Sequence, residues 1–192
     1  MPPLWLSLAM SASGPAVPTD VTARLTCQIW KGSRAVGGTL DPTLRGNPDG
    51  PDEWCVIADY ADEPPASTRD RRLSQITPGD RPSPDGAGAL FIVAMDIVAM
   101  DIQPSIEDEF NDWYNTEHIP LLSAVPGVIC ARRFRAAEGS PRYVAIYHLT
   151  EAKVYASAPW READQTPWIG RMRRFQSNRH YFMFYPPSKP GS

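Results

Sequence analysis

The stretch DWYNTEHIP, residues 112 to 120, places aromatic residues, carboxylates and a histidine directly in front of a proline. Histidine titrates near neutral pH, so His118 could act as a general base or acid. Glu117 stands beside it in the chain, and Asp96 or Asp101, at the end of the preceding predicted strand, could orient or polarise its ring. The candidate catalytic residues are therefore His118, Glu117 and Asp101.

A helix must position these residues, and its start is clearly marked. Ser105, followed three residues later by Asp108, fits the capping-box pattern, and acidic residues in the first turn suit the helix dipole. The pattern predicts a helix from Ser105 to about Ala124, with a bend or break at Pro120, which lacks a backbone donor. Its apolar stripe contains Ile106, Phe110, Trp113, Tyr114 and Leu121.

Glu117 and His118 also have structural interpretations. Glu117 falls in the middle of the apolar stripe, where a carboxylate is costly unless it is paired or protonated. A break at Pro120 would turn Glu117 toward water, or Arg132 or Arg133 could pair with it. His118 lies at the edge of the stripe, where a histidine is often a hydrogen-bonded polar neighbour and not a catalyst.

The chain divides into two parts of different character near residue 88. Residues 1–88 hold twelve of the 21 prolines and only two strand-like pieces, 21–30 and 53–60. Such a segment has difficulty burying enough apolar surface to offset its chain entropy. We predict a weakly structured or disordered N-terminal extension, and the alternative is a small extra domain.

Residues 89–187 show elements in a clear order, and 188–192 form a short tail. A second helical region follows the third strand and starts near Glu151. The order βαββαβ predicts an α+β domain with a ferredoxin-like fold. The predicted strands are 89–102, 127–136, 142–150 and 179–187.

A short repeat complicates the first of these strands. IVAMD occurs twice in succession, at 92–96 and 97–101. A repeat of odd length would put equivalent residues on opposite faces of a flat strand, so either copy could pair in the sheet. The pattern leaves open which copy does.

Both faces of the predicted sheet are apolar or aromatic. Within 142–150, one face carries Tyr143 and Tyr147 and the other carries Val144 and Ile146. Two helices cover only one face, so the other needs a partner sheet or a ligand. The tyrosine-rich face is the better candidate for the face that meets a partner sheet or a ligand, because each hydroxyl needs a hydrogen-bond partner. A second face this apolar predicts a homodimer.

The order of elements, with DEFNDWYNTEHIPLLSAVPGVICARRF across the helix and the second strand, resembles the dimeric α/β-barrel superfamily. Within it, a histidine followed closely by proline, and the segment SAPWREADQTPW, resemble EthD-like and related proteins. The resemblance covers about residues 89 to 187. It implies two sheets packed across a homodimer, with a pocket in each subunit between the sheet and the helices, near the end of the first helix.

The resemblance also sets the predicted function. The superfamily includes cofactor-free monooxygenases, lactone isomerases, polyketide cyclases, haem-handling enzymes and members with no known activity, so the fold alone does not choose among them. The leading hypothesis is a cofactor-independent isomerase, lyase or cyclase, or monooxygenase acting on a compact apolar or aromatic compound. The alternative is a non-catalytic dimeric module for small-ligand binding or assembly.

The implied pocket assigns further residues. Tyr114 or Tyr147 would bind an oxygen of the substrate. Trp160 and Trp168 would lie near the pocket, or could instead only anchor the second helical region. The predicted substrate-binding residues are Trp113, Tyr114, Tyr147, Arg132, Trp160 and Trp168.

Composition narrows the class of protein. A net charge of −3 provides no basic surface for nucleic acid, and no apolar run approaches the ~18 residues of a membrane span. Three dispersed cysteines suggest neither a disulfide framework nor a CxxC metal site and favour the cytoplasm. The N-terminal run MPPLWLSLAMSASGPA is similar to a signal peptide but lacks its positive start. With no nucleotide-binding motif and three distant histidines, we expect no cofactor and no metal.

Overall fold

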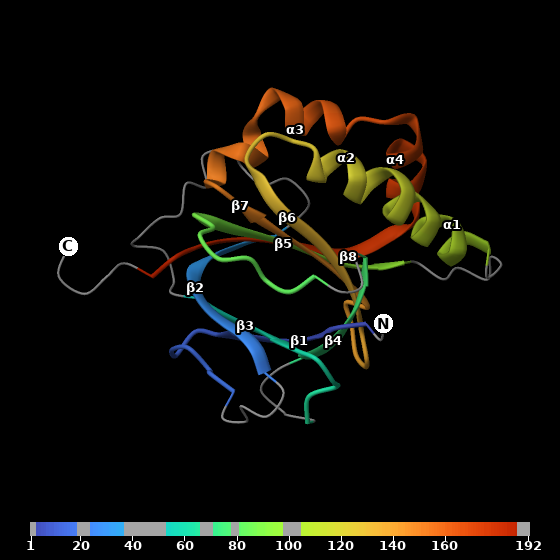
Figure 1. Ribbon diagram of the computed structural model, residues 1–192. Coiled ribbons are helices and arrows are strands. Elements are labelled where there is room, and N and C mark those ends of the chain that lie inside the picture. The colour runs from blue at the N-terminus through green and yellow to red at the C-terminus, as the bar shows by residue number, and fades with distance from the viewer. Residues whose placement is uncertain are drawn as a thin grey trace.

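The computed structural model describes residues 3–18, 24–36, 53–65, 71–77, 81–97 and 105–187. Eight antiparallel strands in these ranges close into one barrel, in the order β1-β3-β2-β8-β5-β7-β6-β4 (Figure 1). The strands are β1 (Trp5–Ser11), β2 (Arg24–Val36), β3 (Glu53–Tyr60), β4 (Arg71–Thr77), β5 (Ala89–Ile97), β6 (Val128–Ala136), β7 (Tyr143–Leu149) and β8 (Gln176–Tyr185).

The helical segments lie together on the outer face of the half-barrel formed by β5 to β8 (Figure 1). The first begins at Ser105, as predicted. The second helical region is divided because the side chains of Ser157 and Thr166 each cap a new short helix, with a proline in its first turn. The segments are α1 (Ser105–Trp113), the π-helical η1 (Tyr114–His118), α2 (Ile119–Ser123), η2 (Ala152–Ala156), α3 (Ala158–Ala163), α4 (Pro167–Met172) and η3 (Arg173–Phe175).

The C-terminal half has the predicted βαββαβ order, with its strands arranged β8-β5-β7-β6. The N-terminal half has the equivalent arrangement β4-β1-β3-β2, and the two halves join through β2 with β8 and β4 with β6. We predicted a weakly structured extension here, but the described residues form four strands of the barrel. The apolar alternation of Leu6 and Leu8 in β1, which we compared with a signal peptide, is a strand signal.

The packing of the barrel interior bears on the predicted homodimer. Leu90, Ile92 and Ile146 of the C-terminal half belong to one buried cluster with Leu6 and Ile57 of the N-terminal half. The sheet face that the helices leave uncovered is therefore covered by the chain's own N-terminal strands. The reason for expecting a homodimer no longer holds.

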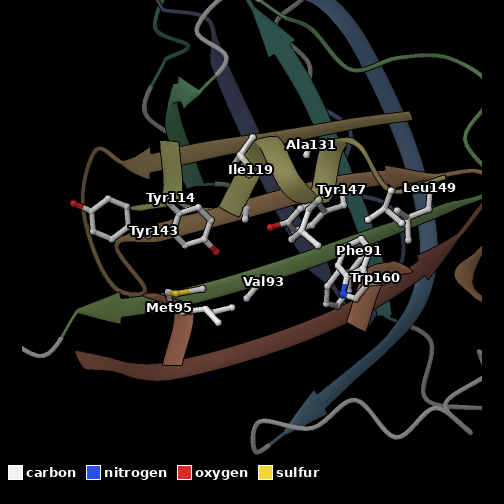
Figure 2. Packing of buried hydrophobic residues seen from close by; sticks show 14 of the residues in the cluster. Phe91, Val93, Met95, Tyr114, Ile119, Ala131, Tyr143, Tyr147, Leu149 and Trp160 are labelled. Carbon is white, nitrogen blue, oxygen red and sulfur yellow. The ribbon is translucent and has the colours of Figure 1, made fainter. Parts of the chain in front are cut away.

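The two faces of the C-terminal sheet are also exchanged relative to our prediction. Tyr143 and Tyr147 pack against the helices, whereas Val144 and Ile146 face the barrel interior. Figure 2 shows the tyrosine-rich face beneath the helical layer. The tyrosine hydroxyls therefore meet the helices and the cavity described below, not a partner sheet.

A buried ion pair crosses the barrel interior. Arg132 on β6 donates to Asp59 on β3 at 2.6 Å, and both side chains are fully buried. Ser83, in the connection between β4 and β5, accepts a hydrogen bond from Arg132 at 2.6 Å, and its backbone N–H donates to Asp59 at 2.8 Å. The pair and its neighbours thus tie the two halves together across the interior.

The first copy of the IVAMD repeat forms β5. Ile92 pairs with Ile146 on one side and with Phe182 on the other. Beyond Ile97, the second copy lies outside the described residues.

Candidate active site

His118 ends a π-helical turn. In η1 the N–H of Ile119 donates to the carbonyl oxygen of Tyr114, five residues earlier. Pro120 has no N–H, and in a regular α-helix its ring would clash with the carbonyl of Thr116; the wider π turn relieves this conflict. The helix therefore continues through Pro120 instead of breaking, and Tyr114 and His118 are both buried.

Aromatic rings enclose His118. The centroid of its imidazole lies 4.6 Å from Trp113 and 4.8 Å from Tyr114. Burial, followed by the charges of Arg173 and Arg133, lowers the pKa of His118 to about 3. The imidazole is therefore neutral near pH 7. No side chain within the described ranges forms a hydrogen bond with its ring nitrogens.

A cavity of about 340 Å³ lies against His118, between the helical layer and the sheet. Phe91 lies on the sheet side of the cavity. Its ring is stacked with those of Tyr147 and Tyr181, at distances of 5.8 Å and 6.2 Å between ring centroids. The volume is at the small end of the range for ligand pockets, ~300 to 1,000 Å³. The aromatic residues that line it are Phe91, Trp113, Tyr114, Tyr147, Tyr155, Trp160 and Tyr181.

Two tyrosine hydroxyls meet at the cavity wall. Tyr114 on η1 and Tyr147 on β7 point their hydroxyl groups toward each other (Figure 2), and each phenol affects the pKa of the other. Burial raises the pKa of both phenols, so both are protonated at neutral pH. A protonated phenol donates one hydrogen bond, so these hydroxyl groups can bind a ligand oxygen in the cavity.

Arg133 on β6 holds the helix that carries the site. Its guanidinium carbon lies 4.5 Å from the ring centre of Tyr114, and its Nη2 donates to the side chain of Asn111 at 2.7 Å. Its Nη1 donates to Asn115, within η1, at 3.4 Å. Burial lowers the pKa of Arg133 to about 10, which leaves it charged at pH 7. We predicted that Arg133 could pair with Glu117; it binds the helix through these asparagines and aromatic rings.

Charged residues gather at one end of the cavity. Asp164, Arg173 and Arg179 line it there, together with Gln176. Arg173 donates to the Asp164 carboxylate at 2.7 Å. Burial raises the pKa of Asp164, and the two arginines oppose that rise. One end of a cavity that is otherwise mainly aromatic and aliphatic is thus polar and contains two cations and one carboxylate.

Five of the residues predicted from the sequence line this cavity. It lies between the sheet and the helices at the end of α1, where the resemblance placed a pocket. The five are His118, Trp113, Tyr114, Tyr147 and Trp160.

The other predicted residues lie elsewhere. Glu117 accepts a hydrogen bond at 2.5 Å from Thr166, the residue that caps α4, so it joins two helices instead of assisting His118. Arg132 faces the barrel interior, on the other side of the sheet, and its partner is Asp59. Trp168 packs half-buried against the helix–sheet core without lining the cavity. Asp101 lies outside the described residues.

Sequence reasoning missed the polar end of the cavity. Arg173 belongs to the basic run RMRRF, residues 171 to 175, whose local pattern does not indicate a cavity, and it both lines the cavity and remains exposed. Strand periodicity could have placed Arg179 at the cavity: Arg179 precedes Tyr181 by two residues on a strand, so both side chains lie on the same face of the sheet. Phe91 and Tyr155 were missed because their role depends on packing between distant elements.

Within the described ranges, no group of three or more His, Cys, Asp or Glu side chains is arranged to hold a metal ion. None of the helices in the described part of the chain is long and apolar enough to cross a membrane.

No family model and no curated protein sequence matches the chain. Among solved structures, a major regulator of staphylococcal pathogenesis superposes with a TM-score of 0.58 over 95% of this chain and 99% of that protein, at 10% identity. A Fusobacterium nucleatum subsp. nucleatum protein (FN1347), described as a candidate monooxygenase, superposes with a TM-score of 0.56 over 96% and 92%, at 7% identity. These likenesses show the fold alone, and they include both halves of the chain. Neither bears on the EthD-like resemblance.

Proposed function

We propose that this protein is a cofactor-independent enzyme that binds a compact aromatic compound in the cavity and removes a proton from it with His118. The observation that carries the proposal is a neutral imidazole at the wall of an aromatic cavity, with no hydrogen bond to another described side chain. Aromatic walls suit a planar substrate, since stacking and apolar burial both favour it.

The chemistry assigns a role to each group at the wall. A neutral histidine accepts a proton through a ring nitrogen. Burial makes the imidazolium costly, but a substrate that becomes negative beside it would favour that form and raise the pKa of His118. The Tyr114 and Tyr147 hydroxyls can donate to the substrate oxygen on which negative charge develops.

Three reaction classes follow from a carbanion or enolate. Return of the proton to another atom is an isomerisation, and expulsion of a group or attack within the molecule is the reaction of a lyase or cyclase. Transfer of electrons to O₂ makes a monooxygenase: a CH₂ group and O₂ give a carbonyl group and water, and the substrate itself supplies the electrons. The monooxygenase class is the first to test, because one protein of similar fold carries that description.

Proton removal can be measured before the final product is known. We would follow hydrogen–deuterium exchange at the acidic CH₂ group of 2-tetralone and benzofuran-2-one by NMR, with oxygen uptake recorded in parallel. The protein should accelerate exchange, and His118→Gln should lower that rate by ~10² or more. His180→Gln is the matched control, because His180 lies on the other face of the sheet, away from this cavity. Exchange that is equally fast in His118→Gln would overturn the assignment.

A non-catalytic binding module is the second candidate. It is favoured by the geometry around His118, to which no described carboxylate is hydrogen-bonded, whereas Glu117 is bound to Thr166. Catalytic histidines are often oriented by a carboxylate. Calorimetric binding of both probes without any acceleration of exchange would support the module and contradict the enzyme.

A further inference from the structure

We infer that the cavity selects aromatic monoanions, with a carboxylate bound by Arg179 at the polar end and the ring against Phe91 and His118. This inference rests on the proposed function for its site, and it adds the charge of the ligand. In this inference the polar end determines which ligand charge is accepted, whereas His118 removes the proton.

The charges at the polar end do not balance. Arg173 is occupied by Asp164, to which it donates from Nη2 both to the carboxylate at 2.7 Å and to the backbone carbonyl at 3.1 Å. Arg179 has only one hydrogen bond, a long one of 3.5 Å to Gln176, and forms no ion pair within the described part of the chain. One carboxylate therefore faces two guanidinium groups, and one positive charge is left for a ligand.

The position of Arg179 sets the orientation of that ligand. Arg179 and Tyr181 lie two residues apart on β8, so both side chains face the helices, and Tyr181 is stacked with Phe91 at an angle of 9°. A ligand whose ring packs on Phe91 and Tyr181 can thus direct its carboxylate toward Arg179. A guanidinium group binds a carboxylate through two parallel N–H donors, which makes the interaction directional as well as charged.

The inference also connects with the base. Arg173 and Arg133 both disfavour a charged imidazole at His118. A bound anion neutralises part of this positive field, and an anionic substrate would therefore help His118 to hold the proton that it removes. A neutral aromatic compound could occupy the same cavity, but it would not stabilise the protonated form of His118 in this way.

The test compares three ligands of the same ring and size: 2-naphthoate, 2-naphthalenemethanol and 2-naphthylmethylamine. Dissociation constants are measured by calorimetry on the full chain at 50 and 500 mM NaCl. We expect 2-naphthoate to bind at least ~10-fold more tightly than the alcohol at low salt, with the amine weakest, and high salt to weaken only the first.

Arg179→Gln should bring the affinities for naphthoate and the alcohol within about twofold, and Arg179→Lys should restore part of the difference. Arg174→Gln is the control, since Arg174 is an exposed residue in the same region and does not line the cavity. Melting curves establish that each variant is folded. Equal affinities in the wild type, or an unchanged preference in Arg179→Gln, would overturn the inference while leaving proton removal by His118 intact. If the wild type prefers naphthoate and Arg179→Gln removes that preference, but His118→Gln does not change exchange, the proposed function alone is overturned.

Discussion

The imidazole of His118 lies over the indole of Trp113, with ring centroids 4.6 Å apart and the planes inclined by 31°. The π-helical turn that begins after Trp113 brings the two rings together. Trp113 thereby shields one face of His118 from water, and the exposed fraction of His118 is only 7%. The site uses an aromatic surface to hold its histidine, where many enzymes use a carboxylate.

The first prediction separates the site from the scaffold. His118→Ala should lower hydrogen–deuterium exchange on the bound probe by ~10² or more, with a loss of ~1 to 2 kcal/mol in the free energy of unfolding, since its ring borders an existing cavity. Phe110→Ala should cost ~3 to 5 kcal/mol, because Phe110 is fully buried in the same core. Urea denaturation measures both. An equal loss of stability in the two variants would make His118 a core residue.

The second prediction concerns acid. Burial, assisted by nearby arginines, lowers the pKa of both His118 and His148 to about 3, below an unfolded value of ~6.5. Between these limits the unfolded chain binds protons that the folded chain does not, so stability falls as the pH falls. From pH 6.5 to 5 the loss should be ~3 kcal/mol for the two groups together.

Urea denaturation at each pH in this range measures the loss. In His148→Gln the free energy of unfolding should fall about half as steeply with pH. The Asp59 carboxyl is a separate contribution. Burial alone would raise its pKa, but Arg132 and hydrogen bonds from Ser83 and Thr26 lower it, so its stabilisation is lost only below about pH 4. A flat profile between pH 6.5 and 5 would contradict the assignment of two neutral buried histidines.

The third prediction concerns Arg132, which we first placed in the substrate site. Arg132→Met should destabilise the protein by ~3 to 5 kcal/mol, because it leaves the Asp59 carboxylate buried without its partner. Adding Asp59→Asn should recover part of that loss. Ligand affinity in the cavity should be unchanged in any folded variant, since Arg132 faces the barrel interior. A selective loss of binding would return Arg132 to the site.

The fourth prediction concerns the N-terminal half. Deleting residues 1–86 removes four strands and exposes the apolar interior face that includes Leu90, Ile92 and Ile146. The truncated chain should lose its cooperative melting transition or associate with itself. The full chain should sediment as a monomer of 21.3 kDa. A folded monomeric truncation, or a stable dimer of the full chain at micromolar concentration, would contradict this arrangement.

The sequence by itself determined the local elements of the C-terminal half. A capping pattern marks the start of α1 at Ser105, and two runs rich in apolar and aromatic residues, separated by the turn-forming stretch AEGSP, mark β6 and β7. These signals act within a few residues, so they can be read without knowing the fold. The resemblance to the dimeric α/β-barrel superfamily, and not a local pattern, led us to expect a pocket near the end of the first helix, where His118 lies.

Only the tertiary structure decided which surfaces these elements share. The period of a strand separates Arg132 from Arg133, but it does not tell which of the two faces the helices. The π turn at Tyr114–His118 and the meeting of Arg179 with Phe91 likewise depend on contacts between distant segments.

The largest difference lies in the N-terminal half, whose strands β1 and β4 are short and flanked by proline-rich stretches. Alone, such strands offer little apolar surface to offset their chain entropy, and local patterns therefore predict disorder. They are stable here because β2 and β4 pair with β8 and β6 and close a barrel around a common core. Strand pairing between residues far apart in the chain is the step that a local pattern does not contain, and in this protein that pairing covers the interior sheet face with the chain's own strands.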